Sequence, residues 1–123
     1  MRTDRELLEL AAKAAGITIQ WSDSWGSYKR DARPVPLGCS EWLLWRPLTD
    51  DGDALRLAVK LGLAVEVDNC DDATRVSESG CDLIAKHMHF DGGPEAATRR
   101  AIVRAAAEIG AQAAAQQNGE SND

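Results

Sequence analysis

The amino-acid sequence predicts an α+β fold, a layered helix-sheet sandwich in which three helices pack on a mainly antiparallel sheet of about four strands. Apolar residues recur at helical spacing in three segments, near residues 4–15, 50–61 and 94–115. Four further segments have the alternation or the composition of strands: residues 17–21, 41–45, 63–68 and 81–90. Because each apolar stripe must be buried against another element, helices layered on a sheet account for all of these patterns.

The length of 123 residues fits one domain. We expect this domain at residues 1–115, followed by a polar tail at 116–123 that is disordered. A hydrophobic content of 44% with 28% charged residues is ordinary for a globular protein. A chain of this size can bury enough surface to fold without disulfides or a structural metal.

The first helix is expected to begin after a capping box. The Thr3 hydroxyl can accept a hydrogen bond from the Glu6 amide, and the Glu6 carboxylate can reach back to Thr3. Gly16 supplies the left-handed residue that ends the helix. Residues 17–21 then alternate between apolar and polar side chains, as a half-buried strand does.

Residues 22–40 are expected to form a long loop, with a short irregular hairpin inside it as an open alternative. Ser, Asp, Gly, Arg and Pro dominate this segment. Pro34 and Pro36 lack the backbone donor that a central strand requires. Loops of this length inside compact domains are often functional, so the segment is a place to look for a binding site.

The middle of the chain predicts a short apolar strand followed by the second helix. Residues 41–45 form the strand, which Pro47 ends. Thr49 or Asp50 would cap the helix, whose first turn carries carboxylates beside the positive end of the helix dipole. Gly62 would end it.

The C-terminal half predicts one strand pair and the last helix. Residues 63–68 and 81–90 are expected to pair antiparallel across a long hairpin loop, because residues 69–80 are polar and turn-prone. Pro94 suits the first turn of the last helix. Four charged residues mark the face of this helix that we expect to be solvated: Arg99, Arg100, Arg104 and Glu108.

Two segments resemble a known family. Residues 45–58 contain a Trp-x-Pro-Leu turn before an Asp-rich helix start, and residues 100–106 belong to an Ala/Arg-rich final helix. In this combination the chain is similar to small tailed-phage and prophage proteins that carry the phage ABA sandwich domain. The resemblance implies an α/β/α-layered sandwich and a phage-encoded origin. It implies no activity and no catalytic residues, and strand ending and helix capping also explain the first motif.

The net charge of −6 argues against general binding to nucleic-acid backbones, which needs a basic surface. No apolar run follows Met1 and none approaches the length of a membrane span, so we expect no membrane partner and a location in the bacterial cytoplasm. The three cysteines, Cys39, Cys70 and Cys81, are expected to be reduced thiols. Self-association into homo-oligomers stays open.

Aromatic and basic residues gather in the expected loop. The candidate binding residues are Trp25, Tyr28, Lys29, Arg30 and Arg33. Aromatic side chains beside cations are typical of protein-binding hot spots and of surfaces that stack on a base. The alternative is that these aromatic rings pack over a small core.

His87 and His89 are candidate metal ligands, because a strand over residues 81–90 places both on one face. The spacing is poor for zinc, since the chain has no Cys-x-x-Cys pair and Cys81 lies about 20 Å from His87 along an extended strand. The alternative is two half-exposed histidines at a strand end. The sequence predicts no cofactor.

We therefore expect a non-enzymatic phage or prophage accessory protein that binds a host or phage protein, with an anti-defence role as one form of this function. One alternative is a small metal- or nucleotide-binding protein, or an enzyme, that uses the strand face around His87 and His89. Another is a structural phage component.

Overall fold

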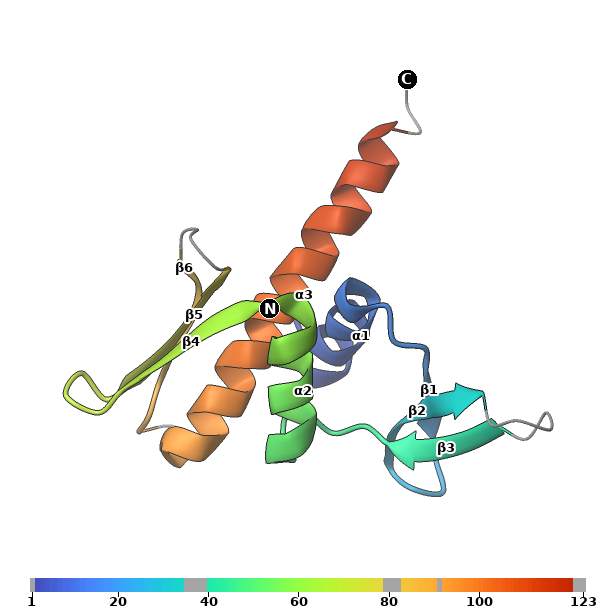
Figure 1. The fold of residues 1–123 in the computed structure, drawn as a ribbon, viewed down its shortest axis with the longest axis horizontal. Helices are drawn as coiled ribbons and strands as arrows, with labels where there is room; N and C mark the ends of the chain where they lie inside the picture. Colours follow the sequence, from blue (N-terminus) through green and yellow to red (C-terminus); the bar gives the residue numbers. More distant parts are fainter. Residues whose placement is uncertain (1, 35–39, 79–82, 91, 121–123) are drawn as a thin grey trace.

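A computed structural model describes residues 2–34, 40–78, 83–90 and 92–120 of the chain (Figure 1). It contains three helices and six strands within these residues. They are α1 (Asp4–Ala15), β1 (Ile19–Ser22), β2 (Ser27–Pro34), β3 (Ser40–Leu44), α2 (Asp51–Leu61), β4 (Leu63–Asp68), β5 (Ala73–Glu78), β6 (Leu83–Met88) and α3 (Gly93–Glu120). Among the described helices, none combines the length and the apolar character needed to cross a membrane.

The strands form two separate antiparallel sheets, ordered β1-β2-β3 and β4-β5-β6. The α+β class with three helices is confirmed, but the single sheet of about four strands is not. Figure 1 shows α3 running between the two sheets, with α1 and α2 packed beside it. The β4–β6 sheet lies against α3, whereas the β1–β3 sheet lies on the other side of the molecule, beyond α1.

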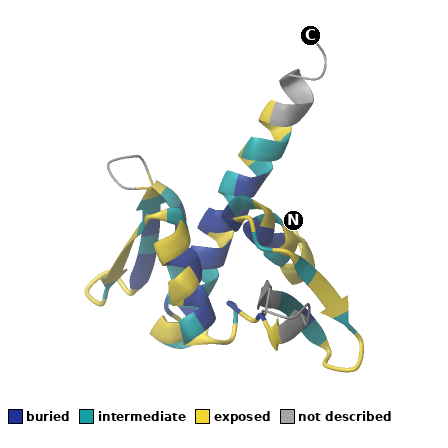
Figure 2. Ribbon diagram, turned by 45° about the vertical axis from the view of Figure 1, so that its right-hand side comes forward, coloured by how far each residue is buried: buried dark blue, intermediate teal, exposed yellow. Residues whose placement is uncertain are grey.

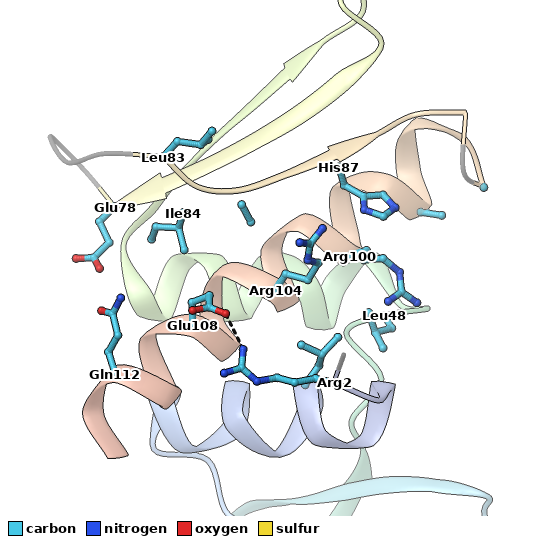
Figure 3. Close-up of a pocket in the computed structure, with 14 residues that line it drawn as sticks. Arg2, Leu48, Glu78, Leu83, Ile84, His87, Arg100, Arg104, Glu108 and Gln112 are labelled. Atoms are coloured by element: carbon cyan, nitrogen blue, oxygen red, sulfur yellow. Dashed lines mark hydrogen bonds and ion pairs between the residues drawn. The ribbon is translucent and has the colours of Figure 1, made fainter. Parts of the chain in front are cut away.

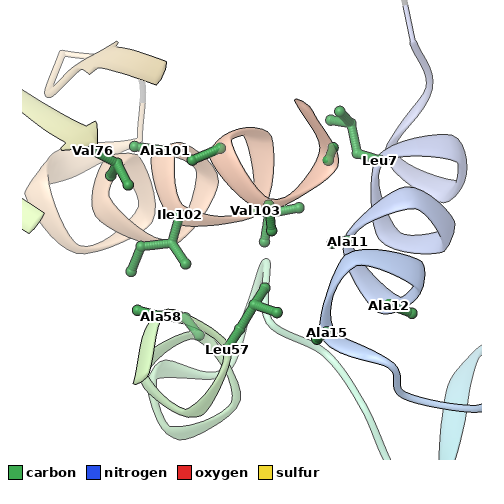
Figure 4. Close-up of a cluster of buried hydrophobic side chains, with 14 of the residues drawn as sticks. Leu7, Ala11, Ala12, Ala15, Leu57, Ala58, Val76, Ala101, Ile102 and Val103 are labelled. Atoms are coloured by element: carbon green, nitrogen blue, oxygen red, sulfur yellow. The ribbon is translucent and has the colours of Figure 1, made fainter. Parts of the chain in front are cut away.

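The core lies where α3 meets α1, α2 and the β4–β6 sheet, and small side chains dominate it (Figure 4). Leu57, Val76 and Val103 are among the largest side chains that are fully buried. Figure 2 shows that burial ends partway along α3, whose C-terminal end projects from the body. The packing of α1 on α3 is close at Gly110, where a Cβ would stand 2.9 Å from the carbonyl carbon of Leu10 and nearer still to its oxygen.

The local signals at the helix ends are confirmed. Thr3 and Glu6 form the expected capping box of α1, and Gly16 ends that helix in the left-handed conformation. Asp50, rather than Thr49, caps α2 by accepting a hydrogen bond from the amide of Asp53. Helix α3 continues through Glu120, into the segment where a tail was expected.

The expected loop at residues 22–40 is wrong over part of its length, because Ser27–Pro34 forms β2, the central strand of its sheet. The register shifts between Asp31 and Pro34, and Pro34 pairs with Ser40 beyond this irregularity. Pro34 therefore lies at the end of the strand, where a missing donor costs the ladder little. The inference from proline was therefore wrong at Pro34, which is the last residue of a central strand, and Pro36 lies outside the described residues.

The expected pairing of residues 63–68 with residues 81–90 is also wrong. Strand β5 lies between β4 and β6 and pairs with both. A tight turn after Asp68 makes this possible: Asp68 accepts hydrogen bonds from the amides of Cys70 and Asp71, and Asp72 takes a positive φ of 49°. The polar composition of residues 69–80 indicated a loop, but Ala73–Glu78 forms β5, in which Thr74 and Arg75 make side-chain hydrogen bonds.

Candidate functional site

The β1–β3 sheet presents a tryptophan at its outer turn. Residues 23–26 connect β1 to β2, and Gly26 adopts the positive φ of 62° that this turn requires. Trp25 lies in the turn with 50% of its surface exposed, and its amide donates to the Ser22 hydroxyl at 3.3 Å. The Lys29 ammonium lies 6.0 Å from the centre of the Trp25 ring, at the outer limit of a cation–π contact.

The other face of this sheet is held against α1. Tyr28 pairs with Trp21 across the strands, and their rings meet edge to face at 5.2 Å. The Tyr28 hydroxyl donates to the Glu9 carboxylate at 2.8 Å, and the Arg5 guanidinium lies 4.0 Å from the centre of the Trp21 ring. Burial, and the hydrogen bond to Glu9, raise the pKa of Tyr28. These contacts fix the orientation of the sheet on the helix.

The structure therefore divides the binding residues expected from the sequence. Trp25 and Lys29 lie together. Tyr28 is buried and acts as an anchor of the sheet on α1. Arg30 pairs with Ile19, so it shares the face of Tyr28 and is half-buried. Arg33 lies in β2, but its side chain is outside the described residues.

Sequence reasoning missed four residues on and beside this sheet. Trp21 and Arg5 form a stacked pair on the face toward α1, and Leu43 and Leu44 of β3 are exposed by 41% and 37%. No local pattern pairs Arg5 with Trp21, because the two residues meet only when α1 and β1 pack. Leu44 pairs with Lys29 and shares its face of the sheet, whereas Leu43 pairs with Arg30 and shares the face of Trp21 and Tyr28. We call Trp25, Lys29 and Leu44 the aromatic surface.

The two histidines have different surroundings. His89 is buried, and its Nε2 lies 2.9 Å from the Thr74 hydroxyl, which in turn lies 2.8 Å from the Thr98 hydroxyl. This chain of polar groups joins β5, the end of β6 and α3. His87 is half-buried and pairs with Thr74 in the ladder. Within the described residues, no three His, Cys, Asp or Glu side chains gather as metal ligands; Cys39 and Cys81 lie outside those residues.

A groove of about 1080 Å³ lies between β6, α3 and the start of α1 (Figure 3). Its lining includes His87 and three arginines, Arg2, Arg100 and Arg104. Arg2 pairs with Glu108 at 2.6 Å and Arg100 with Asp4 at 3.1 Å. The charged face of α3 that was expected to be solvated is thus partly engaged by neighbouring elements.

The remaining member of that expected face, Arg99, connects α3 to the turn before α2. Its guanidinium donates to the Leu48 carbonyl at 2.9 Å and to the Asp51 carboxylate at 2.6 Å. Nearby, the buried Asp53 carboxylate accepts from the Arg46 amide at 2.9 Å. The Trp-x-Pro-Leu turn and its acidic helix start therefore have structural roles: Trp45 lies in the core, and the carboxylates cap and brace α2.

Comparison with family models, with curated proteins and with solved structures finds no match to this chain. The resemblance to phage ABA sandwich proteins stays a prediction.

Proposed function

We propose that this protein acts by binding another protein through the aromatic surface of its β1–β3 sheet. The observation that carries the proposal is Trp25, a half-exposed tryptophan in the outer turn of a sheet that stands apart from the main core. The same proposal includes a phage or prophage accessory role, which rests on the family resemblance alone.

The composition of the surface supports binding. Tryptophan is enriched among residues that dominate protein–protein affinity, because one side chain buries a large area at a small cost in conformational entropy. Leu44 adds exposed apolar area on the sheet face that carries Lys29. A cation beside the ring, here Lys29, adds polar contacts at the edge of an apolar centre.

The surface is also held in place before any partner arrives. Tyr28 bonds Glu9 and Arg5 stacks on Trp21, so two contacts tie the sheet to α1. The amide of Trp45, whose ring is in the core, donates to the Tyr28 carbonyl at 3.0 Å and connects the sheet to the body on its other side. A preorganised surface loses less entropy on binding, which favours affinity.

The test is affinity capture from bacterial host lysate with three forms of the chain. Trp25→Ala removes the proposed anchor. Phe90→Ala is the matched control, because Phe90 is an exposed aromatic residue, 85% accessible, in the turn between β6 and α3 and away from the β1–β3 sheet.

We expect the wild type and Phe90→Ala to recover the same partner, and Trp25→Ala to bind the purified partner about 30-fold more weakly, since a hot-spot truncation costs about 2 kcal/mol or more. Equal affinity of all three forms for that partner would remove the aromatic surface from the proposal.

A further inference from the structure

The groove between β6, α3 and the start of α1 offers a second binding surface, remote from the aromatic surface. We call it the β6 groove. It follows α3 from Ala96 to Gln112, a length of about 24 Å at 1.5 Å per residue. An extended chain of about seven residues spans that distance at 3.3 Å per residue.

One wall of the β6 groove is the open edge of a sheet. Strand β6 pairs with β5 on one side, and no other strand of the described residues pairs with its second side. The amide of His89 donates to the Asp72 carbonyl across from β5, so hydrogen-bonded positions alternate back from His89 along β6. Lys86 and Met88 then direct their backbone N–H and C=O groups away from β5, toward the open edge.

The Lys86 carbonyl confirms this geometry, because it accepts a hydrogen bond from the Arg104 guanidinium on α3. The bond is 3.4 Å long, beyond the usual range for N–H···O, and an arriving amide could replace it. Arg104 has no carboxylate partner among the described residues, in contrast to Arg2 and Arg100. Its guanidinium would then be released toward an incoming anion.

Charge varies along the β6 groove. His87, Arg104 and the Asp4-paired Arg100 occupy the end near the start of α3 and the middle of the groove, whereas Glu78, Gln112 and the Arg2–Glu108 ion pair lie toward the other end (Figure 3). Leu83, 54% exposed, lies beside Glu78 and adds an apolar contact. Because Arg100 and Glu108 are already paired, Arg104 and Glu78 are the lining charges without an ion-pair partner among the described residues, and they suit a ligand with a carboxylate at one end and a cation at the other, joined by apolar residues.

We propose that the β6 groove binds an extended peptide segment of a partner protein, which adds as a strand to the open edge of β6 and places a carboxylate on Arg104. Strand addition supplies main-chain hydrogen bonds, and contacts between the groove and alternate side chains of the peptide supply specificity. A small anion would use the arginines but leave the backbone edge and the Glu78 end without a role. The proposal does not depend on the function of the aromatic surface.

The experiment uses the full chain and two fluorescent heptapeptides, Glu-Val-Glu-Val-Thr-Val-Lys and the same residues in reverse order. A third peptide repeats the preferred order with N-methylated amides at alternate residues on the edge-facing side. Binding is measured by fluorescence anisotropy for the wild type, Arg104→Gln and Lys60→Gln. Lys60 is the control because it is an exposed cation on α2 outside the groove, so its substitution removes the same charge.

We expect one order to bind better than the other, Arg104→Gln to weaken it about tenfold or more, and Lys60→Gln to leave it unchanged. N-methylation should abolish binding, and the amides of Lys86 and Met88 should gain hydrogen-exchange protection when the unmodified peptide is bound. The exchange measurement needs no variant, so it holds even if Arg104→Gln fails to fold. The proposal is overturned if neither peptide binds, if the N-methylated peptide binds equally well, or if inorganic phosphate alone displaces the peptide and protects no β6 amide.

Discussion

Replacing Gly110 with alanine tests the packing of α1 on α3. The substitution would stabilise an isolated helix, but it should destabilise this protein. In an isolated helix, alanine in place of an interior glycine stabilises by about 1 kcal/mol. In this protein the added Cβ would stand 2.9 Å from the Leu10 carbonyl carbon and nearer to the oxygen, where ordinary contacts are 3.4–4 Å. The obstacle is helix backbone, so α1 as a whole must move.

Overpacking of this kind costs about 1–3 kcal/mol, and a rigid obstacle places Gly110→Ala near the upper end. With the propensity gain subtracted, we expect a net loss of about 2 kcal/mol in the free energy of unfolding. Urea denaturation followed by circular dichroism measures it, with the change read from the midpoint if the slope is unchanged.

Gly52→Ala is the matched control, since Gly52 lies in α2 and its added Cβ would meet only the ends of the Arg56 and Asp50 side chains, at 3.2–3.3 Å. These ends can move, so we expect no loss of stability there. If Gly110→Ala is as stable as the wild type or more so, α1 and α3 are not packed as closely as described, and the account of the core fails.

Three further predictions concern polar contacts of the fold. Tyr28→Phe removes the hydrogen bond to Glu9 and should cost about 1 kcal/mol of unfolding free energy; denaturation that matches the wild type would show that this bond does not hold the sheet. Thr74→Val leaves the buried His89 ring without its hydroxyl partner and should cost about 1–3 kcal/mol, whereas a neutral result in the same assay would remove the polar chain from the account. Hydrogen bonds from the Asp71 amide and from Arg75, with a smaller effect of the Cys70 amide, lower the pKa of Asp68. Its contribution to stability is therefore present above the ordinary pKa of about 3.9 and is lost as the pH falls from there through the lowered value. Urea midpoints for the wild type and Asp68→Asn should therefore converge in acid; a gap that is constant from pH 6 to pH 2 would contradict this assignment.

Elements whose signals are local could be predicted from the sequence. Capping at Thr3 and Asp50 involves residues within one turn of each other, and the strand expected at residues 63–68 matches β4 in its bounds, although its burial does not alternate. Strands β2 and β5 could not be predicted in this way. Their sequences are polar, and they become strands because each is central to a sheet and pairs on both sides.

The same distinction between local signals and contacts between distant residues applies to the candidate site. Composition alone pointed to Trp25 and Lys29, which do lie together. It could not separate them from Tyr28, which is buried because a residue nineteen positions earlier, Glu9, accepts its hydroxyl. The open edge of β6 could not be predicted from the sequence either. Which edge is open depends on the pairing of β6 with β5, a strand that sequence reasoning did not find.

The most direct test of the central claim is photo-crosslinking from the turn between β1 and β2. A benzoylphenylalanine placed at position 25 and, as a control, at position 59, an exposed residue of α2 outside both proposed surfaces, reports which site touches a partner during expression in a bacterial host. The account predicts a discrete crosslinked protein from position 25, with none from position 59. A partner crosslinked from position 59 and absent from position 25 would contradict the assignment of binding to the aromatic surface.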